Sequence, residues 1–220
     1  LSFPSLAVSV KAHENAGWRR LADFGLITAL LNPELVFRKK GMVAVGKYMA
    51  LPWKMIKRAF MFAPADGISV NDVSGRLSDL NDYLPEGFVA GDRSAAFMKW
   101  RVGENPRDRM TMLEFQKEGN PVGYAICKFV HRCVEITEIR GTRQNDRRII
   151  AALLRYIDSN KLADSVDFWT LGNSSANLHP TGPGFFKRHF TGSLFIKHHR
   201  RCRLPDEPNR WAISYLDSDW

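Results

Sequence analysis

Short apolar runs separated by polar turns dominate the middle of the chain. Three such runs occupy residues 110–116, 122–130 and 133–139, and a turn at residues 117–120 joins the first two. Runs of this length that are bounded by turn residues are typical of β-strands, and short connections favour antiparallel neighbours. The pattern therefore predicts two antiparallel hairpins in succession.

A different spacing follows the third run. Apolar residues recur three and four positions apart, which is the spacing of one face of an α-helix. The predicted buried face contains Ile149, Ile150, Leu153, Leu154 and Ile157, with Arg148 and Arg155 outside it. The pattern predicts a long amphipathic helix directly after the strands.

The remaining segments complete a mixed set of helices and strands. We expect helices at residues 5–18, 33–62, 70–84, 94–101 and 183–189, with Asp92 or Ser94 as the cap of the fourth. We expect one or two strands at residues 19–31, and further strands at residues 165–171, 193–198 and 210–216. Elements in this order pack as layers. The predicted fold class is α+β, with a central, mostly antiparallel mixed sheet flanked by helices.

The composition is that of a globular protein, with 220 residues of which 45% are hydrophobic. No apolar run approaches the roughly 20 residues that cross a bilayer, and residues 1–10 lack the pattern of a secretion signal. Cys127, Cys133 and Cys202 form no C-x-x-C pair, and their odd number argues against a disulfide framework. His189, His198 and His199 do not indicate a metal site. We expect a cytoplasmic protein without a metal site.

The net charge of +9 indicates attraction to an anionic partner. Nucleic acid is not the expected partner, because no known DNA- or RNA-binding signature accompanies the basic clusters. A membrane surface and a phosphorylated cofactor stay open. Residues 48–62 alternate between apolar and basic positions, so they either pack on the neighbouring domain or lie on a membrane with Trp53 and Phe60 inserted.

The order of elements and several local matches resemble the GNAT superfamily of acyl-CoA N-acyltransferases. The matches are Trp100-Arg101 with Pro106, Gly123 in the run at residues 121–126, and Asn173 before residues 185–190. The Trp-Arg element and the tail at residues 215–220 are similar to a GNAT subgroup often found with cell-envelope polysaccharide genes. The resemblance implies a transferase of the acetyltransferase type that uses acetyl-CoA or another acyl-CoA.

A second match lies at the front of the chain. Residues 3–18 and the strand after them resemble the last helix and strands of another GNAT fold, and are similar to residues 174–196. The resemblance implies a C-terminal remnant of a first GNAT-like half at residues 1–33, a helical connector at residues 34–67 and a GNAT-like domain at residues 68–220. An absent N-terminal half or a homo-oligomer would then complete the first half; alternatively, residues 1–33 pack against the complete domain.

In that family the cofactor pyrophosphate lies on a turn between the fourth strand and the long helix, where the N–H groups of the helix start attract anions. The implied cofactor-binding residues are Ile139, Arg140, Gly141, Thr142, Arg143, Gln144, Asn145 and Asp146, with Asn173 contacting the pantetheine arm. Arg143 and Asn145 occupy positions where the family has small residues. The turn is therefore either a cofactor site or a plain polar connection.

Acyl transfer to an amine requires a deprotonated amine and a polarised carbonyl group. Family members often use a fourth-strand carboxylate as the base, and Glu135 and Glu138 are the candidates here. In a regular strand they face opposite sides, because an odd number of positions separates them. We prefer Glu138 as the catalytic residue, with an ordinary solvated acid as the alternative. The family's thiolate-protonating tyrosine is absent, and Phe185 and Phe186 stand in that region.

Three functions follow as hypotheses. The first is an acyl-CoA-dependent N-acyltransferase that acts on a small amine, an amino sugar or an amino acid. The second is a non-catalytic, degenerate GNAT-like domain with a binding or scaffolding role. The third, based on the charge, is a basic module for a membrane surface or nucleic acid, whose binding would depend steeply on salt.

Overall fold

The structure is a computed structural model that describes residues 7–39, 41–62, 65, 67–76, 80, 83, 88–105, 109–142, 145–171, 180–188, 192–197, 211–212 and 214. Its helical segments are α1 (Ala7–Asn15), α2 (Pro33–Lys39), α3 (Val43–Ile56), η1 (Lys57–Phe62), α4 (Ala95–Met98), η4 (Lys99–Glu104) and α5 (Asp146–Ser159). The segments η1 and η4 are π-helical continuations of α3 and α4. Its strands are β1 (Arg19–Leu30), β2 (Ile68–Asp72), β3 (Val89–Ala90), β4 (Met110–Lys117), β5 (Asn120–Val130), β6 (Cys133–Gly141), β7 (Ser165–Leu171), β8 (Phe185–Arg188), β9 (Ser193–Ile196) and β10 (Trp211–Ala212).

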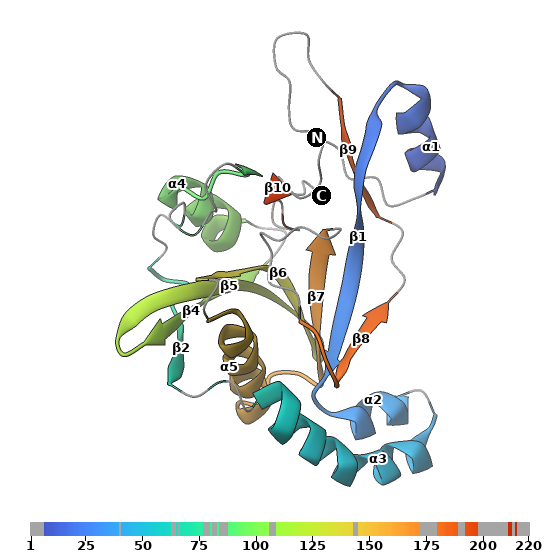
Figure 1. Ribbon diagram of the computed structural model, residues 1–220, viewed down its shortest axis with the longest axis vertical. Coiled ribbons are helices and arrows are strands. Elements are labelled where there is room, and N and C mark those ends of the chain that lie inside the picture. Colours follow the sequence, from blue (N-terminus) through green and yellow to red (C-terminus); the bar gives the residue numbers. More distant parts are fainter. Residues whose placement is uncertain are drawn as a thin grey trace.

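One large sheet forms the centre of the molecule (Figure 1). Its strand order is β2-β4-β5-β6-β7-β1-β8, and β9 also pairs with β1. Only the β6–β7 pair in this sheet is parallel, and β3 and β10 form a separate parallel pair. The predicted fold class, an α+β fold with a mostly antiparallel mixed sheet, is therefore confirmed.

The two predicted hairpins are present as β4–β5 and β5–β6. The β4–β5 turn has positive φ angles at its central residues, 53° at Glu118 and 80° at Gly119. Two-residue turns of this handedness match the twist of the strands that they join, and glycine adopts them without strain. The polar turn read from the sequence therefore fixes the register of the first hairpin.

Helices cover both faces of the sheet. The amphipathic helix α5 packs its predicted apolar residues on one face, where Ile149, Leu153, Leu154 and Ile157 are fully buried. On the other face Met98 of α4 and Val102 of η4 pack against β4 and β5. Ser94 caps α4, since its Oγ accepts a hydrogen bond from the N–H of Phe97 at 3.4 Å. Strand β10 lies on this second face, where Trp211 packs with residues of β1, β7 and β9.

The N-terminal strand β1 is an internal strand of the sheet. It pairs along Phe24–Leu30 with β7 on one edge, and on the other edge β8 and β9 pair with successive parts of it. Ala29 is completely buried, and Thr28 donates a hydrogen bond to Asp167 of β7 at 2.5 Å. The strand predicted at residues 19–31 is thus confirmed, and it belongs to the same sheet as β4 to β7.

The connector between β1 and β2 is helical, as its sequence predicts. Gly46 allows α2 and α3 to approach closely, because a Cβ at that position would lie 3.0 Å from the backbone of Glu34. Trp53 anchors α3, since its Nε1 donates to the carbonyl oxygen of Leu30 at 2.8 Å and its ring stacks on Phe186. Of the two alternatives for residues 48–62, the insertion of Trp53 into a membrane is therefore wrong, because its side chain is buried against the protein.

Two predicted helices overlap strands. Residues 70–84 have helical spacing in sequence, but Ile68–Asp72 forms β2, which pairs with β4 and ends where Asp72 accepts hydrogen bonds from the N–H and hydroxyl of Ser74. Residues 77–79, 81–82 and 84 of that predicted helix lie outside the described residues. The helix predicted at residues 183–189 is replaced by β8, which pairs with the edge of β1. Gly182 and Gly184 have φ angles of 110° and 96°, which a right-handed helix does not contain.

None of the helices in the described part of the chain combines the length and the apolar content that a bilayer crossing requires.

The internal position of β1 predicts the effect of removing it. A protein that lacks residues 1–33 should aggregate or melt at a clearly lower temperature, because the edge of β7 and the apolar side chains beneath β1 become exposed. Size-exclusion chromatography and thermal denaturation measure both effects. A truncation of residues 1–15 removes α1 but keeps β1, so it serves as the control and should stay soluble. A long truncation as soluble and heat-resistant as the whole chain would contradict this prediction.

Candidate functional site

Strands β6 and β7 run side by side only at their beginnings. Their parallel ladder starts with the pair Cys133 and Ser165 and ends with the pair Ile136 and Phe168. From Thr137 onward β6 keeps its ladder with β5, but its other edge has no strand partner in the described part of the chain. The two strands therefore separate at this point, and the buried residues 137–140 of β6 lead to the turn before α5.

A β-bulge coincides with the divergence. Ile126 of β5 is opposite Glu138, whereas the next residue, Cys127, is opposite Ile136, so Thr137 is the extra residue. Its hydroxyl donates to the carbonyl oxygen of Ile126 at 3.0 Å. A bulge of this kind redirects the side chains that follow it.

The bulge changes which glutamates share a face. Glu135 is opposite Lys128 and Glu138 is opposite Ile126, and these two partners alternate on the same face of β5. The expectation that Glu135 and Glu138 lie on opposite faces is therefore wrong, because it assumed a regular strand. Both glutamates lie on the face covered by α4, away from α5.

Both carboxylate oxygens of Glu138 are surrounded by hydrogen-bond donors. Arg93 donates from Nε to Oε1 and Oε2 at 3.1 and 3.0 Å, and from Nη2 to Oε2 at 2.6 Å. Tyr124 donates its hydroxyl to Oε1 at 2.6 Å, and Arg140 donates its Nε to the same atom at 3.1 Å. Ser214 donates its Oγ to Oε2 at 2.6 Å. We call these five residues the Glu138 cluster.

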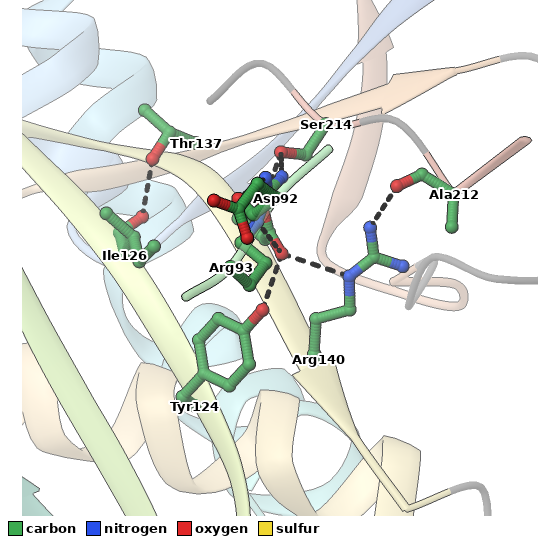
Figure 2. Close-up of polar contacts among 9 residues, drawn as sticks. Asp92, Arg93, Tyr124, Ile126, Thr137, Arg140, Ala212 and Ser214 are labelled. Carbon is green, nitrogen blue, oxygen red and sulfur yellow. Dashed lines mark hydrogen bonds and ion pairs between the residues drawn. The ribbon is translucent and has the colours of Figure 1, made fainter. Parts of the chain in front are cut away.

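The Glu138 cluster joins segments that are distant in sequence, and Figure 2 shows Arg93, Tyr124, Arg140 and Ser214 converging from them. Tyr124 belongs to β5, Glu138 and Arg140 to β6, while Arg93 precedes α4 and Ser214 follows β10. Arg140 also donates its Nη2 to the carbonyl oxygen of Ala212 at 2.5 Å. The side chains of Arg93 and Glu138 are completely buried. The cluster thus ties the segments around β3 and β10 to the central sheet.

Burial and charge act in opposite directions on Glu138. Burial by itself would raise the pKa of its carboxyl group, but the guanidinium groups of Arg93 and Arg140 outweigh this effect and hold the pKa well below its usual range. Burial raises the pKa of Tyr124, and the negative charge of Glu138 raises it further. The carboxylate is therefore ionised and the phenol protonated at neutral pH. A carboxylate with so low a pKa is a weak base, so this environment does not favour the catalytic role predicted for Glu138.

The turn before α5 is fixed by its own hydrogen bonds. The N–H of Thr142 donates to the carbonyl oxygen of Val122 at 3.0 Å, and the N–H of Asn145 donates to the carbonyl oxygen of Thr142 at 2.8 Å. The side chain of Asn145 donates to the hydroxyl of Thr142 at 2.8 Å and makes no capping hydrogen bond to α5. Arg147 and Arg148 in the first turn of α5 are exposed. A helix start at which Asn145 makes no side-chain cap, with two exposed arginines in its first turn, offers donors to a phosphate group.

Gly141 has a packing role in this turn. A Cβ on Gly141 would lie 2.1 Å from Cδ1 of Ile149, and a Cβ on its partner Gly123 would lie 2.4 Å from the carbonyl oxygen of Arg140. Real Cβ atoms do not approach other atoms so closely, so α5 can rest on the end of the β5–β6 ladder only because both residues are glycine.

The structure separates the residues predicted to bind the cofactor. Thr142, Asn145 and Asp146 are at the helix start, whereas the guanidinium of Arg140 is on the opposite face of the sheet with Glu138. Ile139 is buried beneath α5. Arg143, Gln144 and Asn173 lie outside the described residues. Cofactor binding by all of these residues stays a prediction, and for Arg140 only its backbone is near the turn.

Sequence reasoning missed three members of the Glu138 cluster. Tyr124 could have been found, because the predicted β5–β6 hairpin places it opposite Arg140 once the register is known. Arg93 and Ser214 had no such signal. They are 45 and 76 positions from Glu138 along the chain, and only the tertiary fold brings them together.

The described thiols have no catalytic character. Cys127 is completely buried, and burial raises the pKa of its thiol far above the usual value. Burial also raises the pKa of Cys133, to about 11. Both cysteines are therefore protonated at neutral pH and behave as small apolar side chains.

An apolar groove lies elsewhere, along β1. It has a volume of ≈ 620 Å³ and is lined by the middle of β1, the end of β7 and residues 180–188. Gly25 and Thr170 form its floor, and a Cβ on Gly25 would lie 2.6 Å from the hydroxyl of Thr170. None of the described residues that were predicted for catalysis or cofactor binding lines the groove.

No known protein-family model matches the sequence, and no match is found among curated proteins. Solved structures do match the fold. A conserved protein of unknown function from Staphylococcus epidermidis aligns with a TM-score of 0.52 at 14% identity, covering 86% of this chain and 67% of that one. A probable N-acyltransferase from Enterococcus faecalis has a TM-score of 0.54 at 10% identity, covering 83% of this chain and 42% of that one. A GCN5-related N-acetyltransferase from Anabaena variabilis has a TM-score of 0.51 at 10% identity, covering 88% and 44%.

These comparisons show that the chain has a GNAT-like fold. At such low identities the likeness concerns the fold alone, because unrelated functions share folds. The chain spans less than half the length of the Enterococcus and Anabaena proteins. Neither a tandem arrangement of two GNAT-like halves nor the polysaccharide-associated subgroup follows from the comparisons.

The Glu138 cluster predicts a specific dependence of stability on pH. Replacement of Glu138 by Gln should lower the free energy of unfolding at neutral pH by about 3–5 kcal/mol, because two buried guanidinium groups lose their counter-ion. The native pKa of Glu138 lies below the unfolded value of about 4.3. Its stabilising contribution is thus fully present above that value and declines as the pH falls toward the native pKa. Urea denaturation should therefore show the gap between the wild type and Glu138→Gln narrowing below about pH 4.

Two further variants control this measurement. Glu14→Gln removes an exposed carboxylate of α1 and should leave the stability within about 0.5 kcal/mol of the wild type. Ser214→Ala removes one hydrogen bond and should lower the free energy of unfolding by about 1–3 kcal/mol. This milder variant should remain folded and can be measured if Glu138→Gln does not fold. A Glu138→Gln protein whose stability and pH profile equal those of the wild type would show that the buried charge contributes nothing.

The role of Gly141 can be tested by a double-mutant cycle. Gly141→Ala should lower the free energy of unfolding by about 1–3 kcal/mol, because the added Cβ would clash with Cδ1 of Ile149. Ile149→Val lacks that atom, so the double variant should be more stable than the sum of the two single effects predicts. Gly75→Ala is the control, because a Cβ there meets nothing within 4 Å. Additive effects in urea denaturation would refute the packing explanation.

Proposed function

We propose that the chain is an acyl-CoA-dependent N-acyltransferase. The observation that supports this best is the divergence of β6 from β7 after their last parallel pair, Ile136 and Phe168, on the way to the start of α5. An acyl-pantetheine arm is extended and contains amide groups, so it could lie along β6 where the two strands separate. Its phosphates would then lie at the helix start. The Enterococcus and Anabaena structures, described as an N-acyltransferase and an N-acetyltransferase, support the same reaction class.

The described residues fit such a cofactor at its phosphate end. The N–H groups of the first turn of α5 and the side chains of Arg147 and Arg148 would hold the phosphates by charge-assisted hydrogen bonds. Thr142 and Asn145, which are bonded to each other, shape the entrance to the helix. The bound thioester supplies the acyl group. The acceptor that we propose is a small amine, amino sugar or amino acid.

Catalysis in this proposal depends on orientation. The Glu138 carboxylate is fully hydrogen-bonded and has a lowered pKa, so the acceptor amine would lose its proton to water or to a group outside the described residues. Holding two reactants in the correct geometry removes a large part of the barrier of a bimolecular reaction. The Glu138 cluster would contribute by keeping β6 rigid beside the acyl group.

A second candidate function is binding without catalysis. Two observations favour it. Gly141, the only glycine of the turn, is needed for the close packing of Ile149. The preferred base, Glu138, forms ion pairs with Arg93 and Arg140. A degenerate domain of this kind would bind an acyl-CoA or a related phosphate compound without transferring the acyl group. The assignment of residues 1–33 as the remnant of a first GNAT-like half also remains a proposal, since β1 pairs within this sheet.

Calorimetry with acetyl-CoA tests the proposed function. The wild-type chain should bind, and Arg147→Ala combined with Arg148→Ala should weaken the affinity roughly three- to tenfold, because two exposed charge contacts are lost. Lys11→Ala with Arg109→Ala removes two exposed charges away from α5 and should have no effect. Release of free coenzyme A in the presence of small amines separates transfer from binding alone. Absence of both heat and thermal stabilisation at millimolar acetyl-CoA would overturn both candidate functions.

A further inference from the structure

The outer side of α3 is apolar and exposed. Trp53 and Gly46 are the only residues of α3 that are buried, and they attach the helix to the rest of the protein. On the opposite side Tyr48, Leu51 and Met55 are 84%, 72% and 70% exposed. Val45 is 46% exposed, and Phe60 of η1 is 57% exposed. We call these five residues the outer face of α3. Figure 1 shows α3 at the lower end of the molecule, beyond α2 and away from the centre of the sheet.

Four exposed residues of α3 lie along one stripe. At about 100° per residue, Val45, Tyr48, Leu51 and Met55 fall within an arc of roughly 120°. Exposed apolar side chains are common as single residues, but a contiguous set on one helix marks an interaction surface. Helix propensity does not explain the stripe, since alanine or lysine would form the same helix as well.

The charges beside the stripe are all positive. Lys47 and Lys54 lie on one flank of the stripe, and Arg58 continues this flank into η1; all three are exposed. In the sequence, residues 35–62 contain seven lysines and arginines and no aspartate or glutamate. An apolar stripe bordered by basic residues complements a surface that is negatively charged outside and apolar beneath.

We propose that the outer face of α3 binds the surface of an anionic lipid bilayer. In this arrangement α3 lies parallel to the membrane, with Tyr48, Leu51 and Met55 among the acyl chains and Lys47, Lys54 and Arg58 near the headgroup phosphates. Trp53 holds the opposite side of the helix on the protein through Leu30 and Phe186. Membrane binding therefore needs no unfolding or rearrangement of the sheet. The inference does not depend on the proposed acyltransferase function.

Co-sedimentation of the whole chain with vesicles tests this proposal. The protein should sediment with vesicles that contain phosphatidylglycerol and stay in solution with vesicles of phosphatidylcholine alone. The triple variant Tyr48→Ser, Leu51→Ser, Met55→Ser should lose affinity for the anionic vesicles by at least about tenfold. The triple variant Lys47→Ala, Lys54→Ala, Arg58→Ala should lose at least about tenfold too, and added salt should weaken wild-type binding.

Matched variants elsewhere control for loss of hydrophobicity and charge. Phe129→Ser changes another exposed apolar residue, on β5, and Lys11→Ala, Arg76→Ala, Arg109→Ala removes three other exposed charges. Both controls should bind vesicles as the wild type does, and circular dichroism should show that every variant is folded. The proposal is overturned if the wild type ignores anionic vesicles at low salt, or if the α3 variants bind them normally. It is also overturned if light scattering shows a dimer that the serine variant dissociates, because the face would then bind a second copy.

Discussion

The buried carboxylate of Glu138 is the constraint on which the arrangement of this fold depends. An ionised group without water is tolerated only when other charges and hydrogen bonds replace its hydration, and here Arg93, Arg140, Tyr124 and Ser214 do so together. Because these partners come from β5, β6 and the segments beside β3 and β10, none of these segments can move away without leaving a charge unpaired. The cluster consequently specifies one arrangement of the chain around the point where the sheet opens.

The two sides of β6 have different tasks. The side facing α4 contains Glu138 and Arg140 and is closed by buried polar contacts, whereas the side facing α5 is apolar and contains Ile139. Beyond Ile136 the strand separates from β7 and continues toward the start of α5. In the proposed function a ligand would lie at this separation and at the helix start, while the buried side chains keep β6 in place. The proposed binding site and the buried ion cluster would then use different parts of the same strand.

The sequence predicted those parts of the fold whose signals are local. The spacing of Ile149, Leu153 and Ile157 defines α5, and the turn before Asn120 defines the first hairpin, because each pattern reports contacts that close within a few residues. The predictions failed where contacts between residues far apart in the sequence determine the local structure. β2 and β8 are strands because the edges of β4 and β1 offer them hydrogen-bond partners, and a single-sequence pattern contains no information about those edges.

The candidate site shows the same limit. The expectation that Glu135 and Glu138 face opposite sides is correct for a regular strand, but the extra residue Thr137 places them on the same face. Bulges have no reliable signature in one sequence. The proximity of the predicted turn to α5 was foreseeable, since both follow directly from chain order. The burial of Glu138 was not, because Arg93 and Ser214 reach it only after the whole sheet has formed.

The internal position of β1 determines when the chain can fold during its synthesis. Thr28 and its hydrogen-bond partner Asp167 are 139 positions apart, so at 5–20 residues per second about 7 to 28 seconds pass between their appearances. During this time β1 lacks β7, β8 and β9, the strands with which it pairs. Strands β4, β5 and β6 and helix α5 are complete earlier and can pack on each other, so β1 can enter the sheet only after they have been made.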